Sequence, residues 1–103
     1  MMRASSLFVV AAGFLLCGAA QADGAKLFQE KTCWSCHGKD GKKTILPAYP
    51  KIAGQNAAYA ERQMLDIKSG TRANGNSAAM KAVMDLVTED EIKELAAYIA
   101  SMK

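Results

Sequence analysis

The chain has 103 residues, with 13 lysine and arginine side chains against 10 aspartate and glutamate side chains, and a formal net charge of +3. A chain of this length is sufficient for one small domain with a modest hydrophobic core. The small basic excess forms no stripe with interleaved aromatic residues, so nucleic-acid binding is not indicated.

Residues 1–22 are predicted to form a secretory signal peptide. Arg3 is followed by an apolar run over Leu7–Leu16 and by the small-residue cleavage site Ala20-Gln21-Ala22. The uncharged stretch is nearly long enough for an uncleaved membrane anchor, but the cleavage site favours removal. Cleavage leaves residues 23–103 as one domain, eliminates Cys17 and predicts a periplasmic protein without stable membrane insertion.

The mature chain is predicted to start with a short helix over residues 24–31 that leads into Cys33-Trp34-Ser35-Cys36-His37. Two cysteines three apart with a histidine directly after the second are the attachment signature of c-type haem. The two thiols can form thioethers with the two haem vinyl groups, and the adjacent histidine then lies under the iron. Cys33 and Cys36 are therefore predicted to hold one covalent haem c, with His37, the only histidine, as an iron ligand.

Three other interpretations of this motif have less support from the sequence than haem attachment. A thioredoxin-like dithiol belongs to a strand–helix context, and no alternating β-branched runs occur here. A structural zinc site needs four ligands, one more than Cys33, Cys36 and His37 provide. A disulfide module would leave the histidine unexplained.

The middle of the chain alternates loops with one clear helix. A loop is predicted over Gly38–Pro50, followed by a helix over Asn56–Ser69 with Asn56 as its N-cap and Gly70 as its stop. The segment Thr71–Ser77 is rich in turn-forming residues. Met80 follows it in a loop, ahead of a short helical piece that ends at Leu86.

The last helix has the strongest local signals. Thr88 and Glu91 have the spacing of a capping box, and the acidic residues of the first turn suit the helix dipole. An apolar stripe follows, formed by Ile92, Leu95, Ala96, Ile99 and Met102. Since every periodic segment after residue 22 is helical, an all-α fold of four to five short helices is expected.

The second axial position of a haem determines what the protein can do, and four methionines are candidates for it. Met64 and Met102 lie on apolar helical stripes, where core packing is the usual role of methionine. Spacing alone leaves Met80, and after it Met84, as candidates for the second axial ligand. Methionine ligation raises the reduction potential and suits electron transfer, whereas an open position suits gas binding or peroxide chemistry.

Together these residues resemble the class I c-type cytochromes, specifically the small bacterial periplasmic monohaem type. The haem motif carries the resemblance, along with two pairs of residues near the ends of the mature chain. Gly24 and Phe28 are similar to the glycine and aromatic residue of the family's first helix, and Leu95 and Tyr98 to the leucine and aromatic residue of its last helix. The resemblance implies that these two helices cross at those four residues and that the fold wraps one covalently attached haem.

The resemblance also implies roles for two further residues. Leu46-Pro47-Ala48-Tyr49 is similar to the family's proline-containing loop, which implies that the Pro47 carbonyl accepts a hydrogen bond from His37. Pro50 is a rival for this role. The register of the segment before the last helix implies that Met80 is the axial ligand. Trp34 departs from the small residues usual inside the haem motif.

The function that follows from the resemblance is single-electron transfer by a His/Met-ligated haem in the periplasm, without catalysis of a bond-breaking reaction. The expected partners are redox proteins, and we expect a monomer. Lysines near the motif could form a positive rim: Lys39, Lys42, Lys43, Lys51 and Lys81. The alternatives are a five-coordinate gas sensor or small peroxidase, and a haem subunit of a larger redox enzyme.

Overall fold

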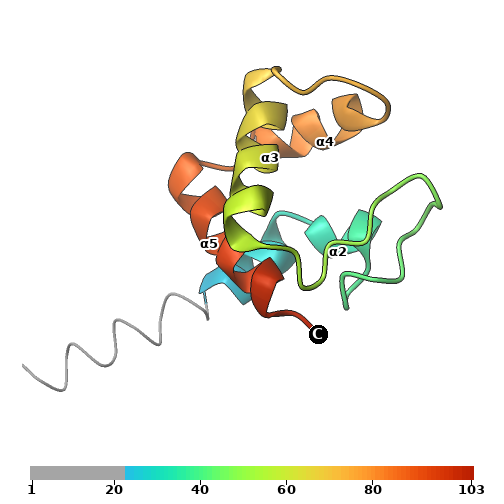
Figure 1. Cartoon of the computed structure of the whole chain (residues 1–103), viewed down its shortest axis with the longest axis vertical. Coiled ribbons are helices and arrows are strands. Elements are labelled where there is room, and N and C mark those ends of the chain that lie inside the picture. Colours follow the sequence, from blue (N-terminus) through green and yellow to red (C-terminus); the bar gives the residue numbers. More distant parts are fainter. Residues whose placement is uncertain (1–22) are drawn as a thin grey trace, which may run out of the picture.

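The computed structural model describes residues 23–103, so the predicted signal peptide, residues 1–22, lies outside the described residues. Within 23–103 every regular element is a helix, which confirms the all-α prediction (Figure 1). None of the helices in this part of the chain has the length and apolarity that a membrane crossing requires.

The helices follow the predicted order, with one short helix at the Cys33–His37 motif that was not predicted. The first covers residues 23–30. It is followed by α2 (Cys33–His37), α3 (Ala57–Ser69), α4 (Ser77–Met84) and α5 (Glu89–Ser101). Among α2 to α5, the pairs that pack on each other are α3 with α5 and α3 with α4.

Local signals set the ends of the two long helices. The Asn56 side chain accepts a hydrogen bond from the Tyr59 amide at 3.0 Å, and Gly70 ends α3 in the left-handed conformation with φ of 88°. Thr88 and Glu91 form both hydrogen bonds of the capping box at the start of α5. These caps were predicted correctly because they depend only on neighbours three residues away.

The segment around Met80 differs from its prediction. Instead of a loop, α4 begins at Ser77 and contains Met80. The amide of Ala79 already donates to the Asn76 carbonyl at 3.2 Å. Small side chains at positions 77–79 allow this early start, because nothing bulky hinders the first turn of the helix.

The first and last helices cross at three of the four residues named by the resemblance, Gly24, Phe28 and Tyr98, while Leu95 is buried in the core. A Cβ atom at Gly24 would lie 2.7 Å from the Cβ of Tyr98, so only glycine allows this approach. One turn further on, the rings of Phe28 and Tyr98 lie 5.5 Å apart between centroids, tilted by 60°. This tilted arrangement avoids face-to-face stacking and is favourable for an aromatic pair.

The core lies between this crossing and α3. Its most deeply buried side chains are Met84, Val87, Ile92 and Leu95. Met64 is buried in it as predicted, whereas Met102 lies beyond the end of α5 and is only partly buried.

Candidate haem-attachment site

The attachment motif forms a helix of its own. The chain turns at Thr32, which has the left-handed φ of 61°, and α2 then carries the five motif residues as far as His37. Residues three apart on a helix lie on the same face, so Cys33 and Cys36 can engage two points on one ring. Both cysteines are free thiols and half-buried.

The environment of Cys33 indicates a structural thiol instead of a reactive one. Burial raises the pKa of Cys33 to about 11, so the thiol is protonated at neutral pH. Redox-active C-x-x-C pairs depend on a lowered cysteine pKa, because the thiolate is the nucleophile. The direction of the Cys33 shift is thus opposite to the one that a thioredoxin-like dithiol needs.

His37 is buried, with 8% of its surface exposed, and its orientation is fixed by a backbone carbonyl. Its Nδ1 lies 2.8 Å from the carbonyl oxygen of Pro50. Since a carbonyl can only accept, Nδ1 carries the proton and Nε2 keeps its lone pair. Such a bond orients a metal-binding imidazole and raises its basicity.

The prediction that Pro47 provides this carbonyl is wrong, because Pro50, its rival, occupies the position. The loop first closes back on the motif through the Ile45 amide, which donates to Cys36 O at 3.0 Å. A turn then follows, in which the Tyr49 amide donates to Leu46 O at 3.0 Å. Pro47 lies inside this turn and is exposed, and the chain returns to His37 only at Pro50.

The loop over residues 38–53 has its own supports. Gly38 has a φ of 87°, and a Cβ there would lie 2.5 Å from the carbonyl oxygen of Lys43. The Asp40 carboxylate accepts hydrogen bonds from the amides of Lys43 and Lys42, and these bonds lower the pKa of Asp40. The amides of Ile52 and Ala53 both donate to Gly41 O, which closes the base of the loop.

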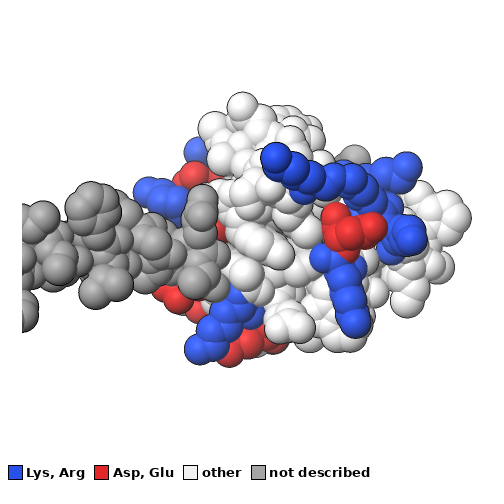
Figure 2. All heavy atoms as spheres, turned by 90° about the horizontal axis from the view of Figure 1, so that it is seen from below, with Lys and Arg blue, Asp and Glu red and all other residues white. Residues whose placement is uncertain are grey.

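Positive charge gathers on this loop. Lys39, Lys42, Lys43 and Lys51 are all exposed. Figure 2 shows basic side chains collected on the right, the side on which Figure 1 draws the loop that follows α2. We call these four residues the loop lysines.

The two methionine candidates have different environments. Met84 is 1% exposed and belongs to the core, while Met80, one turn earlier on α4, is only partly buried at the edge of the core. Helix α4 packs on α3 and not on α2. The structure thus brings Cys33, Cys36, His37 and Pro50 together and places Met80 on a separate element.

The donor set and its surroundings fit a covalent haem. Two free thiols share one helix face, and one histidine has its Nε2 available as a ligand. Apolar side chains beside the motif are exposed to an unusual degree, 65% for Ile45 and 48% for Leu46. A large apolar ring would cover such side chains, because burying apolar surface is favourable.

A helical fold that carries a C-x-x-C-H motif with an oriented histidine defines a c-type haem protein. The model of the cytochrome c family matches residues 21–103, and the chain belongs to this family. It binds haem c covalently through Cys33 and Cys36.

Individual relatives agree with this assignment. The chain is 36% identical to cytochrome c-554(548) of Halomonas halodenitrificans over 72 residues, which cover 70% of this chain and 86% of that protein. It is 38% identical to cytochrome c4 of Pseudomonas aeruginosa over 85% of this chain and 43% of that protein. The crystal structure of reduced recombinant cytochrome c4 from Pseudomonas stutzeri superposes with a TM-score of 0.73 at 31% identity, covering 84% of this chain and 50% of that chain. The chain thus spans half or less of the length of these two cytochromes c4.

Proposed function

We propose that this protein carries single electrons between redox proteins in the bacterial periplasm, with residues 23–103 as the mature monohaem domain. The observation that carries the proposal is the 2.8 Å bond from His37 Nδ1 to Pro50 O beside two free, half-buried thiols. When bound, the haem supplies an iron that cycles between the ferric and ferrous states. The protein makes and breaks no substrate bond.

Each site residue has a passive role in this function. Cys33 and Cys36 tether the ring, and His37 binds the iron through Nε2. Pro50 holds the imidazole at a fixed angle, so little rearranges when the charge on the iron changes.

We propose Met80 as the sixth ligand. It lies at the edge of the core on α4, while Met84 is fully used in core packing. A thioether ligand closes the iron to small molecules and raises its reduction potential, as electron transfer requires.

Optical spectra of the exported, haem-loaded protein test this proposal, in the oxidised, reduced and carbon monoxide-treated forms. We expect a low-spin spectrum with a weak long-wavelength iron–sulfur band and no response to carbon monoxide. A high-spin spectrum that shifts with carbon monoxide would establish an open site and overturn the electron-carrier proposal in favour of a gas sensor or peroxidase.

Two methionine variants identify the ligand. Met80→Ala should remove the iron–sulfur band, open the site to carbon monoxide and lower the reduction potential. Met84→Ala, the matched control, should keep the band and lose about 2–5 kcal/mol of stability, because it leaves a cavity in the core. The opposite pattern would assign the ligand to Met84.

A further inference from the structure

The C-terminal ends of α3 and α4 are held together by two lysines. Lys68, at the end of α3, donates from Nζ to the carbonyl oxygen of Met84, the last residue of α4, at 2.9 Å. Lys81, on α4, donates from Nζ to the carbonyl oxygen of Lys68 at 3.2 Å and also forms an ion pair with Asp85, four residues further along, at 3.0 Å. We call Lys68 and Lys81 the lysine clamp.

The position of the clamp suits its charge. The last carbonyls of a helix have no partner within the helix and carry a partial negative charge. An ammonium group placed there supplies a hydrogen bond and a favourable charge interaction. Lys68 is half-buried, so its bond is less screened than a bond at the open surface, whereas the Lys81 side chain is 44% exposed.

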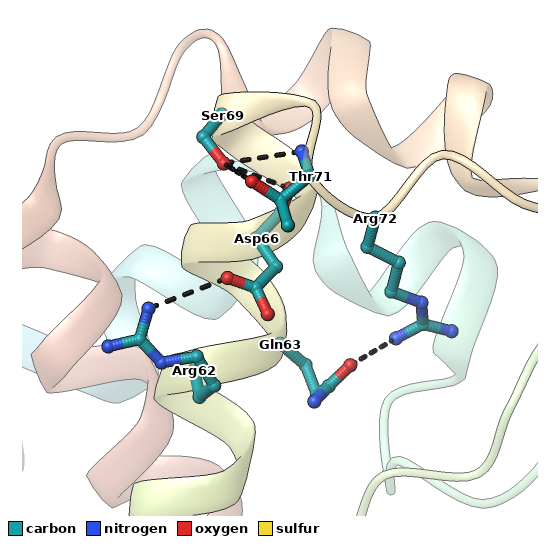
Figure 3. A network of polar contacts seen from close by, with 6 residues as sticks. All are labelled: Arg62, Gln63, Asp66, Ser69, Thr71 and Arg72. Carbon is teal, nitrogen blue, oxygen red and sulfur yellow. Dashed lines mark hydrogen bonds and ion pairs between the residues drawn. The ribbon is translucent and has the colours of Figure 1, made fainter.

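The end of α3 is itself fixed by a polar network (Figure 3). The Arg72 amide donates to Asp66 O at 2.9 Å, and its guanidinium donates to Gln63 Oε1 at 3.0 Å. The Ser69 hydroxyl binds both the amide and the hydroxyl of Thr71. The clamp therefore joins α4 to the end of α3, which is itself held in place by hydrogen bonds.

The opposite end of α4 has one buried residue, Ser77, but within residues 23–103 it has no lysine bond to another helix like those at the C-terminal end. Asn76 at the N-cap makes no side-chain capping bond, and Gly75 before it has open space where a side chain would lie. The C-terminal end is therefore the end at which polar side-chain bonds fix α4, since the Met84 side chain is buried there and the Met84 carbonyl is bound by Lys68. Met80 lies one helical turn before Met84, on the same face.

We propose that the lysine clamp is a positioning device for Met80, which sets the tilt of α4 and so holds the thioether at the sixth position of the iron. This inference rests on the proposed function, since it needs Met80 as the ligand. Lys68 and Lys81 act through α4 and are positioning residues.

The test is the affinity of the oxidised, haem-loaded protein for free imidazole, which must displace the methionine to bind. We expect Lys68→Met and Lys81→Met to bind imidazole about tenfold more tightly, because each loses a hydrogen bond from a charged donor. Lys68→Arg, which keeps a cationic donor, should restore most of the parent affinity. Lys93→Met, at an exposed position on α5, is the matched control and should leave the affinity unchanged.

A double-mutant cycle separates positioning from general stability. If the clamp acts through Met80, Lys68→Met should add nothing to the imidazole affinity of Met80→Ala. Parent-like imidazole affinity in both clamp variants, with an open site in Met80→Ala, would overturn the clamp and leave the proposed function intact. An unchanged spectrum in Met80→Ala would overturn the Met80 assignment and the clamp with it.

Discussion

A Cβ atom at position 24 would lie 2.7 Å from the Cβ of Tyr98 and 2.8 Å from the carbonyl oxygen of Glu94. Both contacts are with parts of α5 that cannot rotate away. We predict that Gly24→Ala separates the first helix from α5 and destabilises the haem-loaded protein by about 1–3 kcal/mol, as overpacking does elsewhere. The midpoint of thermal unfolding, followed by far-ultraviolet circular dichroism, measures the effect.

Lys26→Ala is the control for this substitution. Lys26 is on the same helix, but it is exposed, and its ion pair with Glu30 spans 3.9 Å at the surface. Exposed pairs of this kind contribute little, so the melting midpoint should stay close to that of the parent. Equal loss in the two variants would show that the close crossing at Gly24 is not needed for stability.

The sequence was most informative where structure depends on near neighbours. The Asn56 cap, the Gly70 stop and the capping box of Thr88 and Glu91 could all be predicted, because each involves residues within one helical turn. The haem motif could be predicted for the same reason, since five consecutive residues carry its chemistry.

Two features of the site depended on longer-range relationships and were missed. The choice between Pro47 and Pro50 depends on a turn over residues 46–49 and on the bond from Ile45 to Cys36. Neither feature can be deduced from the spacing of residues in the sequence. The lysine clamp joins side chains to carbonyls 13 and 16 residues away, so the sequence assigns no role to Lys68 and predicts Lys81 only as a member of the positive rim.

The bond from His37 to Pro50 predicts different effects for the two prolines. Pro50→Ala keeps the carbonyl but makes the backbone at this position more flexible. The hydrogen bond to His37 should therefore weaken, and the imidazole should donate less electron density to the iron. We expect a higher reduction potential in a redox titration, because the ferric state loses more stabilisation. Pro47→Ala, in an exposed turn, should leave the potential unchanged, and a larger shift there would return the carbonyl role to Pro47.

Glu91 should make stability depend on pH in the acidic range. The hydrogen bond from the Thr88 amide lowers the pKa of Glu91 from its ordinary value of 4.5, with help from the charge of Lys31 3.8 Å away. A carboxyl with a lowered folded-state pKa stabilises the fold above its ordinary pKa and loses this contribution as the pH falls through the folded-state value.

Glu91→Gln tests this pH dependence. The variant keeps an acceptor for the capping box but cannot ionise, so its melting midpoint should lie below that of the parent at pH 7. The difference should shrink as the pH falls below 4.5. Glu61→Gln on α3 makes the same charge change away from any cap, and a difference for Glu91→Gln that stays constant down to pH 3 would contradict the assignment.

The loop lysines should direct charged redox partners to the haem-attachment site. Lys51 directly follows Pro50, whose carbonyl binds His37, and the carbonyl of Lys43 lies against Gly38, the residue after His37. Positive charge at this place raises the local concentration of anions and speeds their association, an effect that salt screens. The probes are two small redox ions of opposite charge, ferricyanide and a cationic ruthenium ammine, because they need no knowledge of the natural partner.

We expect the double substitution Lys43→Glu and Lys51→Glu to slow electron exchange with ferricyanide by about tenfold at low ionic strength. The same variant should speed exchange with the cationic complex, and both differences should fade as salt is added. Lys93→Glu on α5 changes the net charge by half as much at a distant helix and serves as the control for net charge alone. If the rate changes by the same factor per unit of net charge in both variants, the loop lysines do not steer partners. Steering requires the charge to lie near the site of electron exchange.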